Sequence, residues 1–299
     1  TDLKKKLTSN TRVILLTYLY GIVPNIDELI SFSKRKKLIV IEDFSHCLNG
    51  KFNSKNIGSF GDIGIYSSSS IKTLDTYGGG LLVCKDKNLY YKIKYYQKNL
   101  KPVSRIFLLK KIFFNLIKNI ATERNIFSYL TFNILKILNL INPNIFQRQI
   151  RLKKLSPISS LPKEWFTKYS SLQATVGIKY LSKVSHLDEK RINNLKIITN
   201  NVDNLNYPMG VKNSKNIYWQ FLTYFDNPKK VIYLLQRNKI DCAQTNLILL
   251  TKLKKYNLNL NLKNANYIYN NGLFIPCFPY LNKLDLKHII NSLISLFDE

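Results

Sequence analysis

The chain of 299 residues contains few cysteines, few carboxylates and no long uncharged hydrophobic run. Its four cysteines, Cys47, Cys84, Cys242 and Cys277, lie far apart and form no CxxC pair. This spacing supports neither a zinc site nor a dense disulfide framework, so we predict no metal centre. A chain with this cysteine usage fits a reduced, cytoplasmic context.

Signals for targeting and membrane insertion are also lacking. No uncharged apolar run reaches the roughly 18 residues of a membrane-spanning helix. No apolar signal core follows the basic residues at the start of the chain. Because the chain does not open with methionine, we expect it to begin within a longer protein.

Acidic residues are scarce, since 18 Asp and Glu stand against 46 Lys and Arg, a formal net charge of +28. Such a charge is typical of proteins that bind nucleic acid or an anionic membrane. The excess is mostly lysine and comes with abundant Asn, Ile and Tyr in every segment, a composition that an AT-rich coding sequence produces by itself. Because no recognition helix, zinc finger or RNP-type aromatic motif is present, we predict no nucleic-acid partner.

The first ninety residues alternate strand and helix patterns. Strand patterns cover residues 12–21, 38–43, 63–70 and 78–86, and a helix pattern covers residues 25–37. This α/β rhythm predicts a mostly parallel sheet, and in such sheets ligands bind beyond the carboxyl ends of the strands.

Residues 105–146 interrupt the rhythm with two amphipathic helix patterns. In the first, apolar side chains recur at helical spacing at Ile106, Leu109, Phe113, Leu116, Ile117 and Ile120. Lysine and asparagine form the opposite stripe, and residues 125–141 repeat the pattern. Two interpretations remain open: a helical hairpin packed on the domain, or a basic amphipathic pair that lies on a membrane surface.

A new unit begins after the turn-rich segment near residue 160. Residues 170–202 have the pattern of one long amphipathic helix. Strand patterns follow at 217–225 and 273–281, and helix patterns at 228–240 and 286–297. This order predicts a smaller α+β domain.

One lysine has unusual surroundings. Lys72 follows four consecutive serines and precedes three glycines, and Asp43 ends a predicted buried strand. Pyridoxal phosphate needs a carboxylate for its pyridinium nitrogen, donors for its phosphate and an amine for its aldehyde. A desolvated lysine can be that amine, and a turn rich in hydroxyls and backbone N–H groups can bind the phosphate. Lys72 alone would be an ordinary surface lysine, but this combination indicates a pyridoxal phosphate site.

The segment 40–86 resembles the signature region of the DegT/DnrJ/EryC1/StrS family of sugar aminotransferases. The matching residues are Glu42, Asp43, His46, Gly58, Ser59, Gly61, Asp62, Tyr66, Ser67, Lys72, Gly79 and Gly80. The similarity extends to residues 7–29 before the signature and to residues 170–191 after it, where Gln173, Ala174 and Arg191 are in register.

The resemblance implies the fold and the division of the chain. We expect an α/β fold of the fold type I class of pyridoxal-phosphate transferases, with a mixed, mostly parallel sheet. Residues 1–104 would be a large cofactor-binding domain that lacks the family's N-terminal portion. Residues 105–159 would be an amphipathic helical insertion, and residues 160–299 the long helix and the small α+β domain.

The resemblance also assigns roles. Lys72 would bond to the cofactor's aldehyde carbon and then carry the proton between substrate and cofactor. Asp43 would keep the pyridine nitrogen protonated, His46 would lie beside the ring, and Ser67 would bind the phosphate. We expect Asp62 to hold a turn.

Two other histidines have no predicted role in the site, and several positions differ from the family pattern. We expect His186 and His288 to be structural, because they lie on helix patterns. Tyr18 occupies the position where the family has histidine. Tyr77, five residues after Lys72, occupies a position where the family has glycine. The family's partner-subunit asparagine has no recognisable counterpart before the long helix.

The expected function is a transaminase of the pyridoxal-phosphate class, working as a homodimer in the cytoplasm or at the inner face of the membrane. It would move an amino group from an amino acid, glutamate, to a nucleotide-linked keto-sugar for cell-surface polysaccharide. The alternative is an inactive relic that acts as a binding module or contacts a membrane through residues 105–146. A dehydratase branch of the family replaces the lysine with histidine, and Lys72 argues against it.

Overall fold

The computed structural model describes residues 2–141, 160–245, 247–249, 251 and 262–297. The chain forms two compact units, the first from residues 1–113, 161–189 and 209–219 and the second from the remaining residues. Two helices, α4 (Arg105–Ala121) and α8 (Ser171–Asn201), run through both units.

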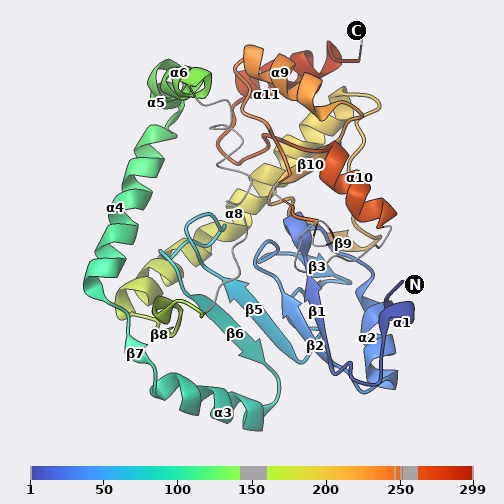
Figure 1. Cartoon of the computed structure of the whole chain (residues 1–299), viewed down its shortest axis with the longest axis vertical. Coiled ribbons are helices and arrows are strands. Elements are labelled where there is room, and N and C mark those ends of the chain that lie inside the picture. Colours follow the sequence, from blue (N-terminus) through green and yellow to red (C-terminus); the bar gives the residue numbers. More distant parts are fainter. Residues whose placement is uncertain (1, 142–159, 246, 250, 252–261, 298–299) are drawn as a thin grey trace. The chain divides into compact units, whose positions relative to one another are not determined.

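The first unit is built on a mixed sheet of four strands in the order β1-β2-β5-β6 (Figure 1). Strands β1 (Val13–Thr17), β2 (Ile39–Asp43) and β5 (Ile63–Ser67) are parallel, and β6 (Gly80–Cys84) is antiparallel to β5. The structure therefore confirms the expected α/β class and the mostly parallel sheet. The carboxyl ends of β2 and β5 carry Asp43 and Ser67, which brings these residues to one edge.

Burial along the strands alternates, so only one face of the sheet is covered by described residues. Ile14 and Val40 point into the core with exposed fractions of 8% and 3%. On the other face Val13 is 45% exposed, Leu15 60% and Ile39 47%. The predicted burial of residues 38–43 holds for Val40 and Glu42, whereas Ile39 is exposed. The apolar sequence of this strand did not show that one face is left uncovered.

Helix α2 (Ile26–Arg35) begins where Asn25 caps it, accepting a hydrogen bond from the N–H of Glu28 at 3.4 Å. Helix α3 (Lys87–Lys98) begins in the same way at Asp86. Such side-chain caps satisfy N–H groups that the first helical turn leaves unpaired. The remaining short elements of the first unit are α1 (Asp2–Lys6), η1 (Leu19–Gly21), β3 (Lys51–Phe52), β4 (Lys55–Asn56), β7 (Lys101–Pro102), η3 (Lys163–Trp165), β8 (Thr167–Lys168) and β9 (Ser214–Lys215).

The second unit contains an antiparallel sheet in the order β10-β12-β11. Its strands are β10 (Phe221–Tyr224), β11 (Ala243–Gln244) and β12 (Gly272–Ile275), and its helices include α9 (Pro228–Arg237), α10 (Lys263–Asn271) and α11 (Lys283–Ile294). Phe221, Leu273 and Leu293 are almost fully buried in this unit. The sequence predicted β10, α9, β12 and α11, whereas β11 and α10 were missed.

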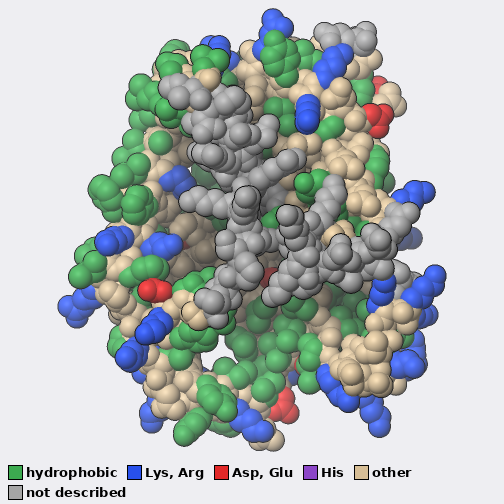
Figure 2. Space-filling view, in the orientation of Figure 1, with side chains coloured by type: hydrophobic (Ala, Val, Ile, Leu, Met, Phe, Trp, Pro, Cys, Tyr) green, Lys and Arg blue, Asp and Glu red, His purple; other side chains and the backbone are tan. Residues whose placement is uncertain are grey.

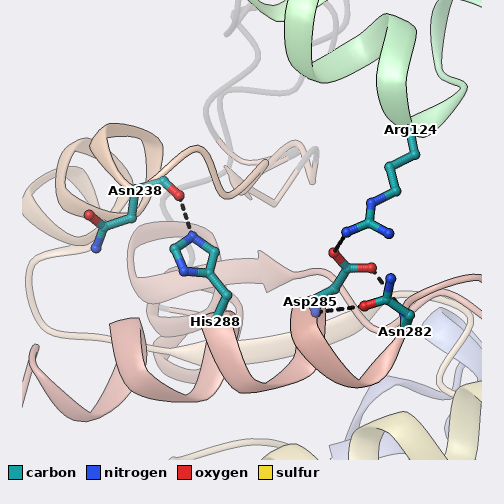
Figure 3. A network of polar contacts seen from close by, with 5 residues as sticks. All are labelled: Arg124, Asn238, Asn282, Asp285 and His288. Atoms are coloured by element: carbon teal, nitrogen blue, oxygen red, sulfur yellow. Dashed lines mark hydrogen bonds and ion pairs between the residues drawn. The ribbon is translucent and has the colours of Figure 1, made fainter.

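A small polar network lies at the start of α11 (Figure 3). Asn282 and Asp285 exchange hydrogen bonds of 2.9 Å in each direction, which makes a capping box. Asp285 also pairs with Arg124 at 2.9 Å. On the same helix, Nε2 of His288 lies 2.6 Å from the carbonyl oxygen of Asn238, so this histidine has a structural contact.

The described part of the amphipathic segment is helical. Helix α4 is followed by α5 (Arg124–Ile126), the π-helix η2 (Phe127–Thr131) and α6 (Phe132–Ile141). Residues 142–146 of the predicted pair lie outside the described residues. Leu108 is the buried residue of α4, whereas the six apolar residues of the predicted stripe are 46–67% exposed. Packing of this stripe on the domain would have buried them. In the part of the chain that is described, no helix is both long and apolar enough to cross a bilayer.

None of the four cysteines, all of which are described, forms a disulfide, and Cys47, Cys242 and Cys277 are buried. Burial raises the pKa of the Cys47 thiol to about 12. It raises the pKa of Cys277 equally, with a partly offsetting effect of Arg191. These thiols stay protonated and unreactive at neutral pH.

Candidate active site

Asp43 is held at the end of β2 by the turn that follows it. Its Oδ1 accepts hydrogen bonds from the backbone N–H of Ser45 at 3.0 Å and from the Ser45 hydroxyl at 2.5 Å. The Ser45 Oγ in turn accepts the N–H of Ser67, at the end of β5, at 2.9 Å. One chain of hydrogen bonds therefore fixes the strand-end carboxylate relative to the strand-end serine.

Lys72 lies on a closed loop. The N–H of Ser68 donates to the Gly79 carbonyl at 3.0 Å, and the Ser68 carbonyl accepts the N–H of Thr76 at 3.0 Å and of Gly78 at 3.2 Å. Ser68 is buried and uses its hydroxyl on the Gly78 carbonyl at 3.2 Å. Within the serine run, the hydroxyl of Ser68 therefore stabilises the loop. The hydroxyls of Ser67 and Ser69 lie 3.4 Å apart.

The long helix braces this loop. Gln173 of α8 donates through Nε2 to the carbonyls of Thr76 at 3.1 Å and Gly78 at 3.0 Å. Its Oε1 accepts the N–H of Ser170 at 3.0 Å. The Tyr169 hydroxyl donates to Thr76 Oγ1. Gln173, which matches the family pattern, therefore joins the lysine loop to helix α8 by two hydrogen bonds.

The amine of Lys72 is half-buried beside an aromatic ring. Its Nζ lies 4.7 Å from the centre of the Trp219 ring. Burial lowers the pKa of Lys72, and the carboxylate of Asp43 opposes this shift in part. A lowered pKa increases the neutral fraction of the amine, which is the form that attacks a carbonyl carbon.

His46 also contacts Trp219. The His46 and Trp219 rings stack with centroids 4.1 Å apart and an interplanar angle of 19°. The His46 Nδ1 accepts the N–H of Tyr20 at 3.1 Å, so the proton of the neutral imidazole lies on Nε2. Burial first and the nearby Lys72 second lower the pKa of His46 to about 4, while Asp43 opposes the shift.

Trp219 was missed in the sequence, although it touches both predicted site residues. Its Nε1–H donates to the carbonyl of Ile71 at 3.2 Å, directly before the lysine. It lies just before β10, far from the signature segment, and no spacing rule connects it to Lys72. The sequence gives one indication of its importance, which is that tryptophan is rare: the chain has two.

Two further carboxylates of the signature segment, Glu42 and Asp62, have structural roles. Glu42 is fully buried and accepts hydrogen bonds from the Tyr18 hydroxyl at 2.5 Å and from the N–H groups of Gly58, Phe60 and Gly61 at 2.9, 2.6 and 2.6 Å. Burial, reinforced by Glu42, raises the pKa of the Tyr18 phenol.

Asp62 accepts the N–H of Val40 at 2.8 Å and so holds a turn, as the sequence predicted.

The donor set fits pyridoxal phosphate. Lys72 offers a half-buried amine of lowered pKa, and Asp43 is a fixed carboxylate close enough to influence the pKa of both Lys72 and His46. Ser67 and Ser69 offer hydroxyls in one turn. These are the three kinds of group that the cofactor requires. His186, which the sequence placed on a helix, lies on α8 apart from this set of contacts.

We expect the free energy of unfolding to rise between about pH 4 and pH 6.5, because the unfolded chain binds a proton at His46 that the folded chain refuses in this window. The difference between the two pKa values of His46 corresponds to a change of up to about 3 kcal/mol in the free energy of unfolding. Denaturation in urea at several pH values should give a weaker pH dependence for His46→Gln. A wild-type His46 signal that titrates near pH 6.5 in NMR spectra would contradict the buried position.

Tyr77 adopts a left-handed backbone conformation, with φ of 64°, at the position where the family pattern has glycine. Side chains with a Cβ are strained there by about 1–2 kcal/mol. We expect Tyr77→Gly to be more stable than Tyr77→Ala by about 1 kcal/mol, since both lack the ring and only glycine relieves the strain. Urea denaturation of the two variants checks this, and equal midpoints would show that the strain is absent.

Comparison with known proteins identifies the family. The chain belongs to the DegT/DnrJ/EryC1/StrS aminotransferase family, whose model matches residues 1–103 and 166–294. The match passes over the segment that contains α4, α5, η2 and α6.

Curated relatives are similar over a short part of the chain. GDP-perosamine synthase of Escherichia coli O157:H7 is 36% identical over 89 residues, which are 30% of this chain and 24% of that protein. UDP-N-acetyl-3-dehydro-alpha-D-glucosamine 3-aminotransferase of Acidithiobacillus ferrooxidans is 33% identical over 89 residues, 29% of this chain and 24% of that protein. The chain thus spans about a quarter of each of these relatives.

Solved structures are similar in fold over almost the whole chain. The aminotransferase PseC of Helicobacter pylori has a TM-score of 0.71 at 16% identity, covering 99% of this chain and 69% of that chain. DesV of S. venezuelae, solved with a ketimine intermediate, has a TM-score of 0.71 at 15% identity, covering 99% and 68%. The fold type I class expected from the sequence is confirmed by these likenesses.

Proposed function

We propose that the protein is a pyridoxal-phosphate-dependent aminotransferase that moves an amino group from an amino acid, glutamate, to a nucleotide-linked keto-sugar. The observation that carries the proposal is the juxtaposition of a half-buried Lys72 of lowered pKa with Asp43 and His46. Two relatives, a GDP-perosamine synthase and a UDP-N-acetyl-3-dehydro-alpha-D-glucosamine 3-aminotransferase, support the class of acceptor by their names.

In this proposal each residue has one task toward the cofactor. Lys72 would hold the cofactor through its amine and would carry a proton during amino transfer. Asp43 would accept a hydrogen bond from the pyridine nitrogen, and the neutral His46 would lie beside the ring. Ser67, with Ser69, would donate to the phosphate. The cofactor itself supplies the electron sink.

The proposal extends to the organisation of the chain. Residues 1–104 carry the cofactor contacts, residues 105–159 are an insertion, and residues 160–299 supply the bracing helix and the small domain. We infer a homodimer in the cytoplasm, where the free thiols stay reduced. The basic surface favours a substrate that carries a diphosphate.

Amino transfer can be measured directly. The full chain is incubated with pyridoxal phosphate, glutamate and a GDP- or UDP-linked keto-sugar, and formation of 2-oxoglutarate and of the amino sugar is followed. We expect both products in equal amounts, and neither without the keto-sugar. Absence of both products from a folded protein would favour the alternative of an inactive binding module.

A further inference from the structure

Helix α4 turns an apolar face outward. Leu108, its buried residue, lies on the inner side. In the apolar stripe, Ile106 is 67% exposed, Leu109 64%, Leu116 55% and Ile120 50%. Figure 2 shows hydrophobic side chains gathered over α4 with lysines and arginines among them. Contiguous exposed apolar surface of this kind marks an interaction site.

The charges around this face are of one sign. Helix α4 contains Arg105, Lys110, Lys111 and Lys118 and no Asp or Glu. At about 3.6 residues per turn, Arg105 and Lys110 lie at the two borders of the apolar stripe. Cations at the borders of an apolar face are the pattern of a helix that lies in the interface of a lipid bilayer.

We propose that α4 docks lengthwise on an anionic lipid surface. Its apolar face would enter the boundary between headgroups and acyl chains, and Arg105 and Lys110 at the borders of that face would contact anionic headgroups. Helix α4 lies in the segment that the family model passes over. The proposal therefore does not rest on the proposed enzymatic function.

Charge decides between a lipid surface and a second copy of the chain. An isologous contact between two copies of α4 would bring Arg105 and Lys110 of one copy close to the same cations of the other, because a twofold axis pairs the same patch with itself. Like charges placed together across an interface oppose association. An anionic bilayer instead neutralises the two border cations while it covers the apolar stripe.

The test is sedimentation of the full chain with vesicles of phosphatidylcholine containing phosphatidylglycerol, compared with vesicles of phosphatidylcholine alone. We expect binding to the anionic vesicles that weakens as salt is added. The double variant Leu109→Gln, Leu116→Gln should bind at least about tenfold more weakly, because two exposed leucines no longer enter the lipid. Glutamine preserves helix propensity, so the helix remains.

Matched variants separate lipid binding from general effects. Leu284→Gln changes a leucine that is 72% exposed on α11 and should leave vesicle binding unchanged. Arg105→Gln with Lys110→Gln should weaken binding about fivefold for each charge removed, whereas Lys229→Gln with Lys287→Gln should have a smaller effect. Equal binding to both kinds of vesicle, or no binding, overturns the proposal. The proposal is also overturned if the double variant Leu109→Gln, Leu116→Gln no longer forms a dimer but still binds vesicles. That result would assign the apolar face to contact with a second copy of the chain.

Discussion

Replacing Lys72 with alanine is expected to abolish amino transfer. The substitution removes the amine that the proposed mechanism uses twice, first to hold the cofactor and then to move a proton. Loss of the proton-transfer role alone lowers a rate by roughly 10²–10⁴-fold. The initial rate of 2-oxoglutarate formation measures the effect, and circular dichroism shows that the variant is folded.

Lys72→Arg is the matched control for charge. Arginine keeps a cation beside the Trp219 ring, but its guanidinium is always protonated and cannot attack an aldehyde. We expect Lys72→Arg to be as inactive as Lys72→Ala. Activity within tenfold of the wild type in either variant would show that Lys72 is not the reacting amine.

Replacing Glu42 with alanine is expected to be the most destabilising change in the first unit. The Tyr18 hydroxyl and the N–H groups of Gly58, Phe60 and Gly61 all donate to this buried carboxylate. Each buried donor left without an acceptor costs about 1–3 kcal/mol. The sum is at least about 4 kcal/mol, a large part of the 5–15 kcal/mol that typically stabilises a folded protein.

Urea denaturation of Glu42→Ala and Tyr18→Phe measures the effect. The tyrosine variant removes one of the four donors and should lower the free energy of unfolding by about 1–3 kcal/mol. A Glu42→Ala protein within about 1 kcal/mol of the wild type would mean that water or a rearranged turn replaces the carboxylate.

The sequence predicted much of the fold because local signals and the pattern of burial agree. Helix α2 begins after Asn25, whose cap is a local signal, whereas α11 begins at Lys283, three residues before its predicted start, because the capping box of Asn282 and Asp285 was missed. The strands before Asp43 and Ser67 end where the sequence placed those residues. Elements without such signals, such as the two-residue strand β11, were missed.

Parts of the site could not be predicted, because they depend on contacts between residues far apart in the chain. The stacking of Trp219 on His46 joins residues 173 positions apart, and no periodicity encodes it. The role of Ser68 in closing the lysine loop could not be distinguished from phosphate binding, since both need a hydroxyl in a tight turn. The outward direction of the α4 stripe was also undecided, because an amphipathic pattern does not say what its apolar face contacts.

The measurement that tests the central claim most directly is the mapping of a reduced cofactor adduct. The protein is incubated with pyridoxal phosphate and reduced with borohydride, and the modified peptide is identified by mass spectrometry, with Lys72→Ala as control. We predict one adduct, on Lys72, that is absent from the variant. Labelling scattered over many lysines and unchanged in the variant would contradict an organised site at Lys72.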